Sequence, residues 1–185
     1  MSRRADDGVP RQSQERIQAL LAQDSCADPA MDDILLWSRD LMLLRAAAAR
    51  GAPLELDPAA LAAGRLAVLA AARQGDGPLG RLIQEAKLGD AALEILLCLV
   101  LGNMGLIQRV TDGEDVLDRL AHVDGAAVAV ARELQGGGEL FASALIFTDG
   151  DDDDEACSGA EVELLLADRV MRAIAGVEED DGSTL

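Results

Sequence analysis

The chain has 185 residues and a net charge of −18, and half of its residues are hydrophobic although only 2% are aromatic. This length suits one domain of ordinary size or two small ones, with a core of leucine, alanine, valine and isoleucine that favours helices. The negative charge opposes direct binding to nucleic acid and would attract a basic surface on a partner protein.

The cysteines are few, widely spaced and odd in number: Cys26, Cys98 and Cys157. The sequence therefore predicts neither a disulfide framework nor a zinc site, and a cytoplasmic location fits best. No apolar run of a secretion signal occurs near the start. Residues 91–107 are the most apolar stretch, but they are short for a membrane span and include Glu94 and Asn103, so we expect a buried helix there.

The chain is expected to begin with a flexible arm, residues 1–12, which is followed by a helical subdomain, residues 13–76. After a first helix, a second is expected with Asp28 as its cap and Pro29 at its first position. Gly51 would end this helix. Its apolar residues recur at helical spacing and predict one buried face: Ile34, Trp37, Leu41 and Leu44.

A third helix shows the same signals, with Asp57 as the cap, Pro58 directly after it and Gly75 at its end. The residues expected to face the core are Leu61, Val68, Leu69 and Ala72. We place a subdomain boundary just after this helix.

Residues 77–176 are expected to form a winged-helix-like subdomain of three helices, a hairpin and a closing helix, and residues 177–185 an acidic flexible tail. A short helix would begin at Pro78 and end near Gly89. Asp90 is expected to cap the most buried helix. The inward residues of that helix are predicted to be Leu93, Leu96, Leu97, Val100 and Leu101.

The next helix is expected to begin at a capping box formed by Thr111 and Glu114. A further helix would bury Ala127, Val128, Ala131 and Leu134. Residues 139–147 are predicted to form a strand and residues 160–166 its return, and the closing helix would pack Val170, Met171 and Ile174. The predicted fold class is mostly α with a small β-hairpin, an α+β fold.

An acidic run lies between the two predicted strands: Asp149, Asp151, Asp152, Asp153, Asp154 and Glu155. It is not an EF-hand loop, because Asp154 and Ala160 stand where glycine and glutamate are needed. The default interpretation is a solvated hairpin tip. The alternatives are a docking patch for a basic partner and weak binding of divalent cations.

No catalytic constellation is evident. His122 is the single histidine and lies at a helix end, Cys98 lies in an apolar run, and Glu94 is explained by its position near a helix start. No phosphate-binding loop, catalytic triad or metal-site signature occurs, so the sequence predicts no enzyme and no cofactor. An enzyme with an unrecognised site would have to use these three residues.

Two segments resemble the N-terminal helical and winged-helix-like region of bacterial AAA+ ATPases. These are "PLGRLIQEAKLGDAALEILLCLVLG", residues 78–102, and "LFASALIF … VELLLADRVMRAIAG", residues 140–176. The resemblance covers about residues 30–176 and implies a non-catalytic recognition or assembly domain, with the ATPase module absent from these 185 residues.

The main hypothesis is therefore a protein–protein interaction domain whose acidic tip and tail attract basic partners, with no direct contact to nucleic acid or membrane. The alternative is a stand-alone acidic regulatory protein that masks a basic surface of a nucleic-acid-binding partner.

Overall fold

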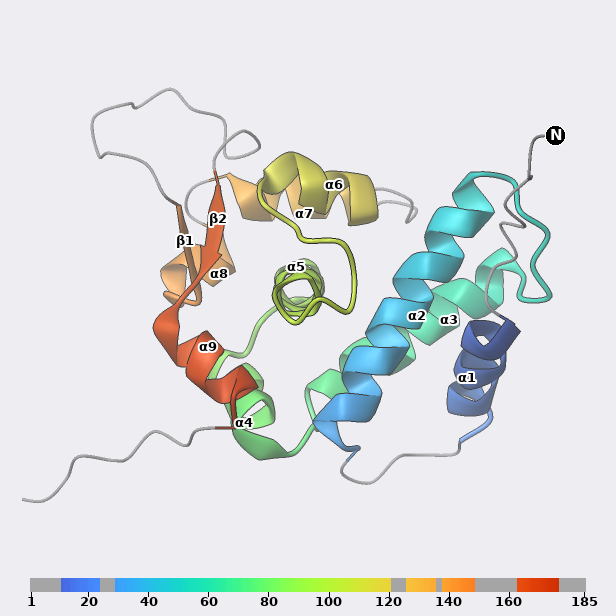
Figure 1. Ribbon diagram of the computed structural model, residues 1–185, viewed down its shortest axis with the longest axis horizontal. Helices are drawn as coiled ribbons and strands as arrows, with labels where there is room; N and C mark the ends of the chain where they lie inside the picture. The colour runs from blue at the N-terminus through green and yellow to red at the C-terminus, as the bar shows by residue number, and fades with distance from the viewer. Residues whose placement is uncertain (1–10, 24–28, 121–125, 136–137, 149–162, 177–185) are drawn as a thin grey trace, which may run out of the picture.

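The computed structural model describes residues 11–23, 29–120, 126–135, 138–148 and 163–176. These residues are mostly helical and include one small antiparallel sheet of two strands (Figure 1), which confirms the predicted α-rich class with a hairpin. The described elements are α1 (Arg11–Leu21), α2 (Met31–Ala49), α3 (Pro58–Ala72), α4 (Gly77–Ala86), α5 (Asp90–Asn103), α6 (Gly113–Leu120), α7 (Ala126–Leu134), α8 (Glu139–Ala142), β1 (Ile146–Thr148), β2 (Leu164–Leu166) and α9 (Asp168–Ile174). Within this part of the chain, no helix is both long and apolar enough to cross a membrane.

Helix α5 lies at the centre of the molecule and is seen end-on in Figure 1, with other helices around it. Every residue from 92 to 102 is buried, so this helix is apolar on all sides, as expected for a core helix. The predicted inward residues are all buried: Leu93, Leu96, Leu97, Val100 and Leu101. The cluster around them includes Ile34 of α2 and Leu69 of α3 as well as residues of α9. The regions on either side of the predicted boundary therefore share one core.

Helices α1, α2 and α3 pack against one another around a second, smaller apolar cluster. Asp40 of α2 is fully buried beside it and accepts hydrogen bonds from Ser13 and Arg16 of α1 and from Arg39. Burial alone would raise the pKa of Asp40, but these hydrogen bonds outweigh it and lower that pKa. This buried carboxylate ties α1 to α2. Helix α1 begins at Arg11, two residues before the expected start of the helical subdomain at residue 13.

Two of the predicted helix boundaries are confirmed in detail. Asp57 caps α3 by accepting a hydrogen bond from the Ala60 N–H at 2.7 Å, and Pro58 is the first helical residue. Gly51 ends α2 with a φ of 75°, and the N–H of Ala52 bonds back to the Ala47 carbonyl at 3.0 Å.

Three other predicted boundaries are wrong. Helix α2 begins at Met31 with Ala30 before it, so Pro29 precedes the helix. Asp90 is the first residue of α5 and does not cap it, because its carboxylate binds Arg73 Nη2 at 2.7 Å. Helix α4 ends at a left-handed Lys87 (φ 51°) rather than at Gly89.

The capping box before α6 is shifted by one residue from the predicted pair. Asp112 accepts a hydrogen bond from the Asp115 N–H at 2.9 Å, and Asp115 accepts from the Thr111 N–H and hydroxyl. These hydrogen bonds from Thr111 lower the pKa of Asp115. Glu114 takes no part in the box, because an aspartate is a better cap than the threonine before it.

The predicted strand over residues 139–147 is wrong in its first part, which forms α8. The Leu140 N–H at the start of α8 donates to Glu133 Oε1 at 2.8 Å, and Ala144 (φ 50°) turns the chain after it. Strand β1 then pairs with β2 in the register Ile146↔Leu166, Phe147↔Leu165 and Thr148↔Leu164. The other side of β2 meets the segment before α6, where the Leu164 N–H bonds to the Thr111 carbonyl at 2.9 Å. Among the described residues from 77 to the hairpin there are five helices, α4 to α8, where three were expected.

Two side chains predicted to face the core are exposed. Val128 of α7 is 60% exposed, because Val130 and Leu134, four residues apart, form the buried face of that helix. Met171 of α9 is also exposed, while Val170 is buried.

Candidate functional site

The acidic residues predicted as a docking patch lie outside the described residues: Asp149, Asp151, Asp152, Asp153, Asp154 and Glu155. His122 lies outside them as well, so its interpretation and that of the acidic run stay predictions. Of the candidates for chemistry, the structure describes Glu94 and Cys98, both in α5. Within the described residues, no group of three or more His, Cys, Asp or Glu side chains is arranged to hold a metal ion.

Cys98 is completely buried in the middle of α5, as the apolar run around it predicted. Burial raises the pKa of its thiol to about 12. Because the thiolate is the nucleophilic form, this side chain is unsuited to covalent catalysis near neutral pH.

Glu94 is a buried counter-ion, so its explanation as a helix-start charge is wrong. Its side chain is 6% exposed and accepts hydrogen bonds from Arg65 Nε at 2.9 Å and Nη2 at 2.7 Å, and from Arg45 Nη1 at 3.2 Å. These three residues, here called the buried triad, join α2, α3 and α5. Burial lowers the pKa of Arg45, whereas the hydrogen bonds from the more exposed Arg65 to Glu94 raise the pKa of Arg65.

A cavity of about 20 Å³ adjoins the buried triad and is also lined by Ser38. Two buried polar atoms, Ser38 Oγ and Arg45 Nη2, have no hydrogen-bond partner among the described residues. The cavity is large enough for one water molecule and far too small for an organic substrate. The triad is therefore a structural feature that links three helices, and not an open catalytic site.

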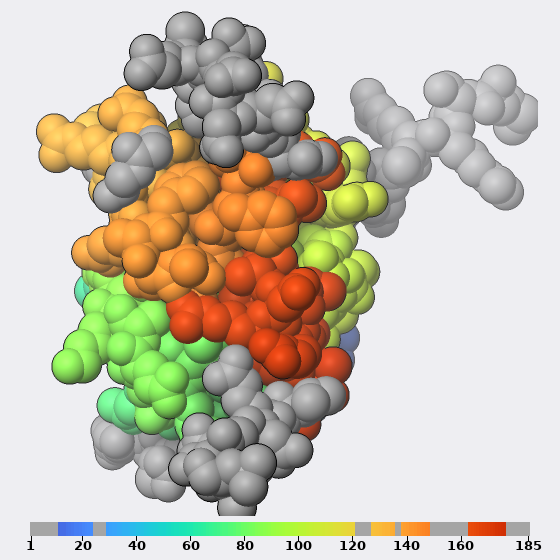
Figure 2. Space-filling view, turned by 90° about the vertical axis from the view of Figure 1, so that its left-hand side faces the viewer, coloured from blue at the N-terminus to red at the C-terminus, as the bar shows by residue number. Residues whose placement is uncertain are grey.

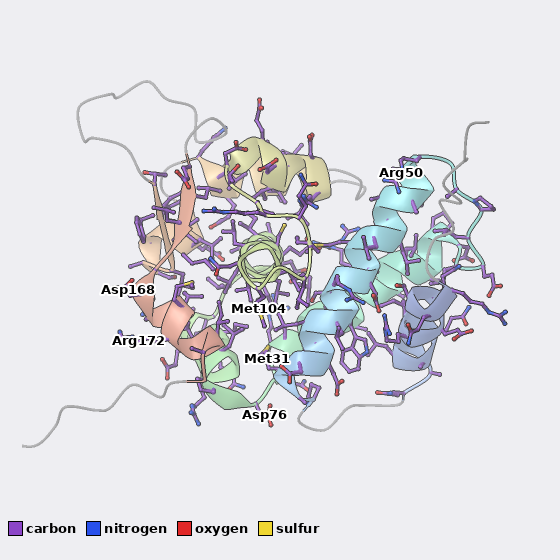
Figure 3. The ribbon with its side chains drawn as sticks, viewed as in Figure 1. Met31, Arg50, Asp76, Met104, Asp168 and Arg172 are labelled. Carbon is purple, nitrogen blue, oxygen red and sulfur yellow. The ribbon has the colours of Figure 1, made fainter. Side chains whose placement is uncertain are left out.

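A second hollow is larger and opens to the surface, and it forms where the ends of four helices meet. Its volume is about 170 Å³, and we call it the helix-end groove. The start of α2, the start of α4, the end of α5 and the end of α9 each contribute to it, and Figure 3 shows Met31, Met104 and Asp76 at this position. The described lining residues are Met31, Asp32, Leu35, Asp76, Gly77, Pro78, Leu79, Met104, Ala173, Ile174 and Gly176.

The lining is mainly apolar, with two carboxylates as the only charged groups among its described residues. Leu35, Leu79 and Ala173 are buried, and Met104 is 41% exposed. Asp32 and Asp76 are exposed, and neither side chain makes a hydrogen bond or ion pair with another described residue. Asp76 stands at the N-cap position of α4 but makes no capping hydrogen bond, so its oxygens are not engaged by the described part of the chain.

The turn that carries Asp76 is held in place by close packing. A Cβ atom added to Gly80 would lie 2.0 Å from the Gly75 carbonyl oxygen, and one added to Gly75 would lie 2.7 Å from the Met31 side chain. The contact with backbone needs glycine at position 80, whereas a side chain at position 75 would require the Met31 methyl group to move. Helix α4 also packs on α9, and Figure 2 shows α9 (red) between α4 (green) and residues 138–148 (orange) on one face. The groove is therefore formed by elements that are fixed against one another.

The described lining of the groove offers apolar surface and negative charge, but no nucleophile and no imidazole. Such a lining suits binding of a group that is apolar at one end and positively charged at the other. Sequence reasoning missed this groove because its residues come from four segments that are far apart in the chain. The available signal was local: "GDGP" before α4 predicts a turn that leaves Asp76 at a helix start.

Comparison of the chain with family models, with curated proteins and with solved structures found no match. The resemblance to the N-terminal region of AAA+ ATPases therefore stays a prediction.

Proposed function

We propose that this chain is a non-catalytic protein–protein interaction domain that docks a partner with a basic surface. The observation that carries the proposal is the helix-end groove, an apolar hollow bordered by the carboxylates of Asp32 and Asp76, which pair with no other described residue. The buried charged side chains of the triad and of Asp40 form hydrogen bonds between helices and therefore serve to hold the core together.

The distribution of charge supports the same proposal. Of the net charge of −18, the segments outside the described residues contribute −14, which leaves −4 on the described part. Residues 149–162 alone carry −7, and residues 177–185, which follow the groove residue Gly176, carry −4. Two concentrated acidic segments next to a nearly balanced helical body provide electrostatic attraction for a basic protein.

The winged-helix-like architecture and the association with an AAA+ ATPase are part of the proposal. Helices α5, α6 and α7 pack on one another, and the hairpin follows them in the chain. The backbone of Asp112, between α5 and α6, forms an antiparallel β-bridge with that of Glu163 beside β2. This order supports a winged-helix-like arrangement into which α8 is inserted. Exposed Val128 and Ala129 on α7 favour a protein over a phosphate backbone as the partner of this helix. A cytoplasmic location belongs to the same proposal.

The test is affinity capture with a charge-matched reference. The purified chain is immobilised on one resin and polyaspartate of equal total charge on another, and both are incubated with an extract of the source cells over a salt series. We expect a discrete protein that the chain retains at moderate salt and the polymer does not. Retention of the same basic proteins by both resins would contradict a specific docking function.

The same experiment distinguishes this proposal from the alternative, a stand-alone acidic regulatory protein that masks a basic surface of a nucleic-acid-binding partner. If the retained protein binds nucleic acid and duplex DNA displaces it from the resin, the chain masks a basic DNA-binding surface. If DNA has no effect, the partner is recognised by features other than its nucleic-acid site.

A further inference from the structure

Resting on the proposed docking function, we propose that the helix-end groove binds one aliphatic side chain of a partner segment in which an arginine or lysine directly flanks that side chain. The aliphatic group would occupy the hollow between α2, α4, α5 and α9, and the cation would face Asp32 and Asp76. This inference names the chemistry of the partner at the groove itself, independently of the acidic segments.

The size of the groove selects a single anchor residue. Its volume of about 170 Å³ is below the roughly 300–1,000 Å³ typical of pockets for drug-sized ligands. It is large enough for one branched aliphatic side chain. Buried Leu35 and Leu79 provide a firm apolar surface, while Met31 and Met104 contribute flexible thioether side chains that adapt to the shape of a guest.

The charges at the groove select the neighbour of that anchor. Asp32 and Asp76 carry the charge of the described lining, and no described cation lines the groove with them. An apolar guest without a cation would leave both carboxylates without a partner. A flanking arginine or lysine would pair with them, each exposed pair strengthening binding by about 1.5- to 5-fold.

The same charges argue against an occupant from this chain. Residues 177–185 begin next to the groove residue Gly176, but they carry four acids, Glu178, Glu179, Asp180 and Asp181, and no base. A second copy of the chain would bring a further net charge of −18. Both would be repelled by the two carboxylates, so a segment of a different, basic protein is the occupant that charge complementarity favours.

The methionines of the chain provide an internal set of reporters for the test. Met31 and Met104 line the groove, whereas Met42 is buried in the core and Met171 is exposed on α9 outside the groove lining. The protein is labelled with ¹³C at the methionine methyl groups and titrated with three blocked dipeptides, followed by NMR. The probes are acetyl-Leu-Arg-amide, acetyl-Leu-Glu-amide and acetyl-Gly-Arg-amide.

We expect acetyl-Leu-Arg-amide to shift the methyl signals of Met31 and Met104 with millimolar affinity, and to leave those of Met42 and Met171 unchanged. The Leu-Glu probe should bind at least about 2-fold more weakly, because it lacks the cation that pairs with the carboxylates. The Gly-Arg probe should bind about 10-fold more weakly or worse, because it lacks the aliphatic side chain that the groove buries. Equal binding of the Leu-Arg and Leu-Glu probes would overturn the role of the carboxylates. No shift of Met31 and Met104 with the Leu-Arg probe would overturn the proposal.

Matched variants separate the local effect of the carboxylates from total charge. Asp32→Asn with Asp76→Asn should weaken binding of the Leu-Arg probe by about 2- to 25-fold. Asp33→Asn with Asp118→Asn changes net charge by the same amount at exposed positions outside the groove lining, and should leave the affinity unchanged. Equal weakening by both pairs would overturn the groove as the site of recognition.

The outcome of this experiment is distinct from that of the capture experiment. A partner captured specifically, with no methyl shift from the probe, would sustain the docking function and overturn the groove inference. A methyl shift with no protein captured would sustain the groove as a binding site and remove the docking function.

Discussion

Replacing Glu94 with glutamine removes the single negative charge of the buried triad, which leaves Arg45 without its counter-ion and Arg65 with only the weaker influence of Asp90. The side chains of Glu94 and Arg45 are about equally buried, at 6% and 7% exposed. Glutamine keeps one oxygen as an acceptor, but its NH₂ group would face a guanidinium that also donates. Breaking a buried ion pair by removing one partner costs about 3–5 kcal/mol of stability. For a chain of this length we expect the Tm to fall by about 6–20 °C.

The assay is urea unfolding of wild type and Glu94→Gln, with Asp90→Asn as the matched control. Asp90 lies on the same helix and binds Arg73 at 2.7 Å, the same distance as that from Arg65 Nη2 to Glu94, but this pair is 39% and 46% exposed. We expect the control to cost less than about 1 kcal/mol. Equal costs for the two variants would refute the argument that burial gives the triad its importance. Replacing all three triad residues with leucine should restore most of the stability lost in Glu94→Gln.

Three further changes test other parts of the structure. Asp40→Asn should cost about 1–3 kcal/mol of stability at neutral pH. Because the folded pKa of Asp40 is lowered, its contribution is present above the unfolded pKa of about 3.9 and is lost as the pH falls through the folded pKa. The difference in stability between the variant and wild type, measured by urea unfolding, should therefore narrow below about pH 4. Ala144→Gly should raise the free energy of unfolding by about 0.5–1 kcal/mol, because alanine at φ 50° is strained, and calorimetry would detect the higher Tm. Gly80→Ala should destabilise by about 2 kcal/mol or more, since its Cβ would overlap the Gly75 carbonyl, and an unchanged urea midpoint would contradict that packing.

The features that the sequence predicted correctly depend on nearby residues. Asp57 caps α3 and Gly51 ends α2 because the groups that they satisfy lie within a few residues. The burial of α5 was predictable because its apolar residues occupy every face of the helix. In each case the physical cause lies within one turn or one helix, where a local pattern carries the necessary information.

The features that the sequence did not predict depend on distant residues. Glu94 was assigned to the helix start because its partners Arg65 and Arg45 lie 29 and 49 positions away. Asp90 has a good capping sequence but binds Arg73, 17 positions away. The helix-end groove needs the ends of four helices to meet, and no local signal specifies that meeting. The start of α8 also depends on Glu133, which satisfies the Leu140 N–H from outside that helix.

Salt dependence separates the contributions of charge and shape to binding. At physiological ionic strength the screening length is about 8 Å, so the acidic segments attract a partner over a short range and this attraction weakens as salt is added. Apolar burial in the helix-end groove is not screened in this way. A partner held by both should associate more slowly at high salt yet keep much of its residence time. A partner held by charge alone should dissociate at the same salt concentration as it does from polyaspartate. The helix-end groove is therefore what distinguishes a docking domain from a general acidic competitor.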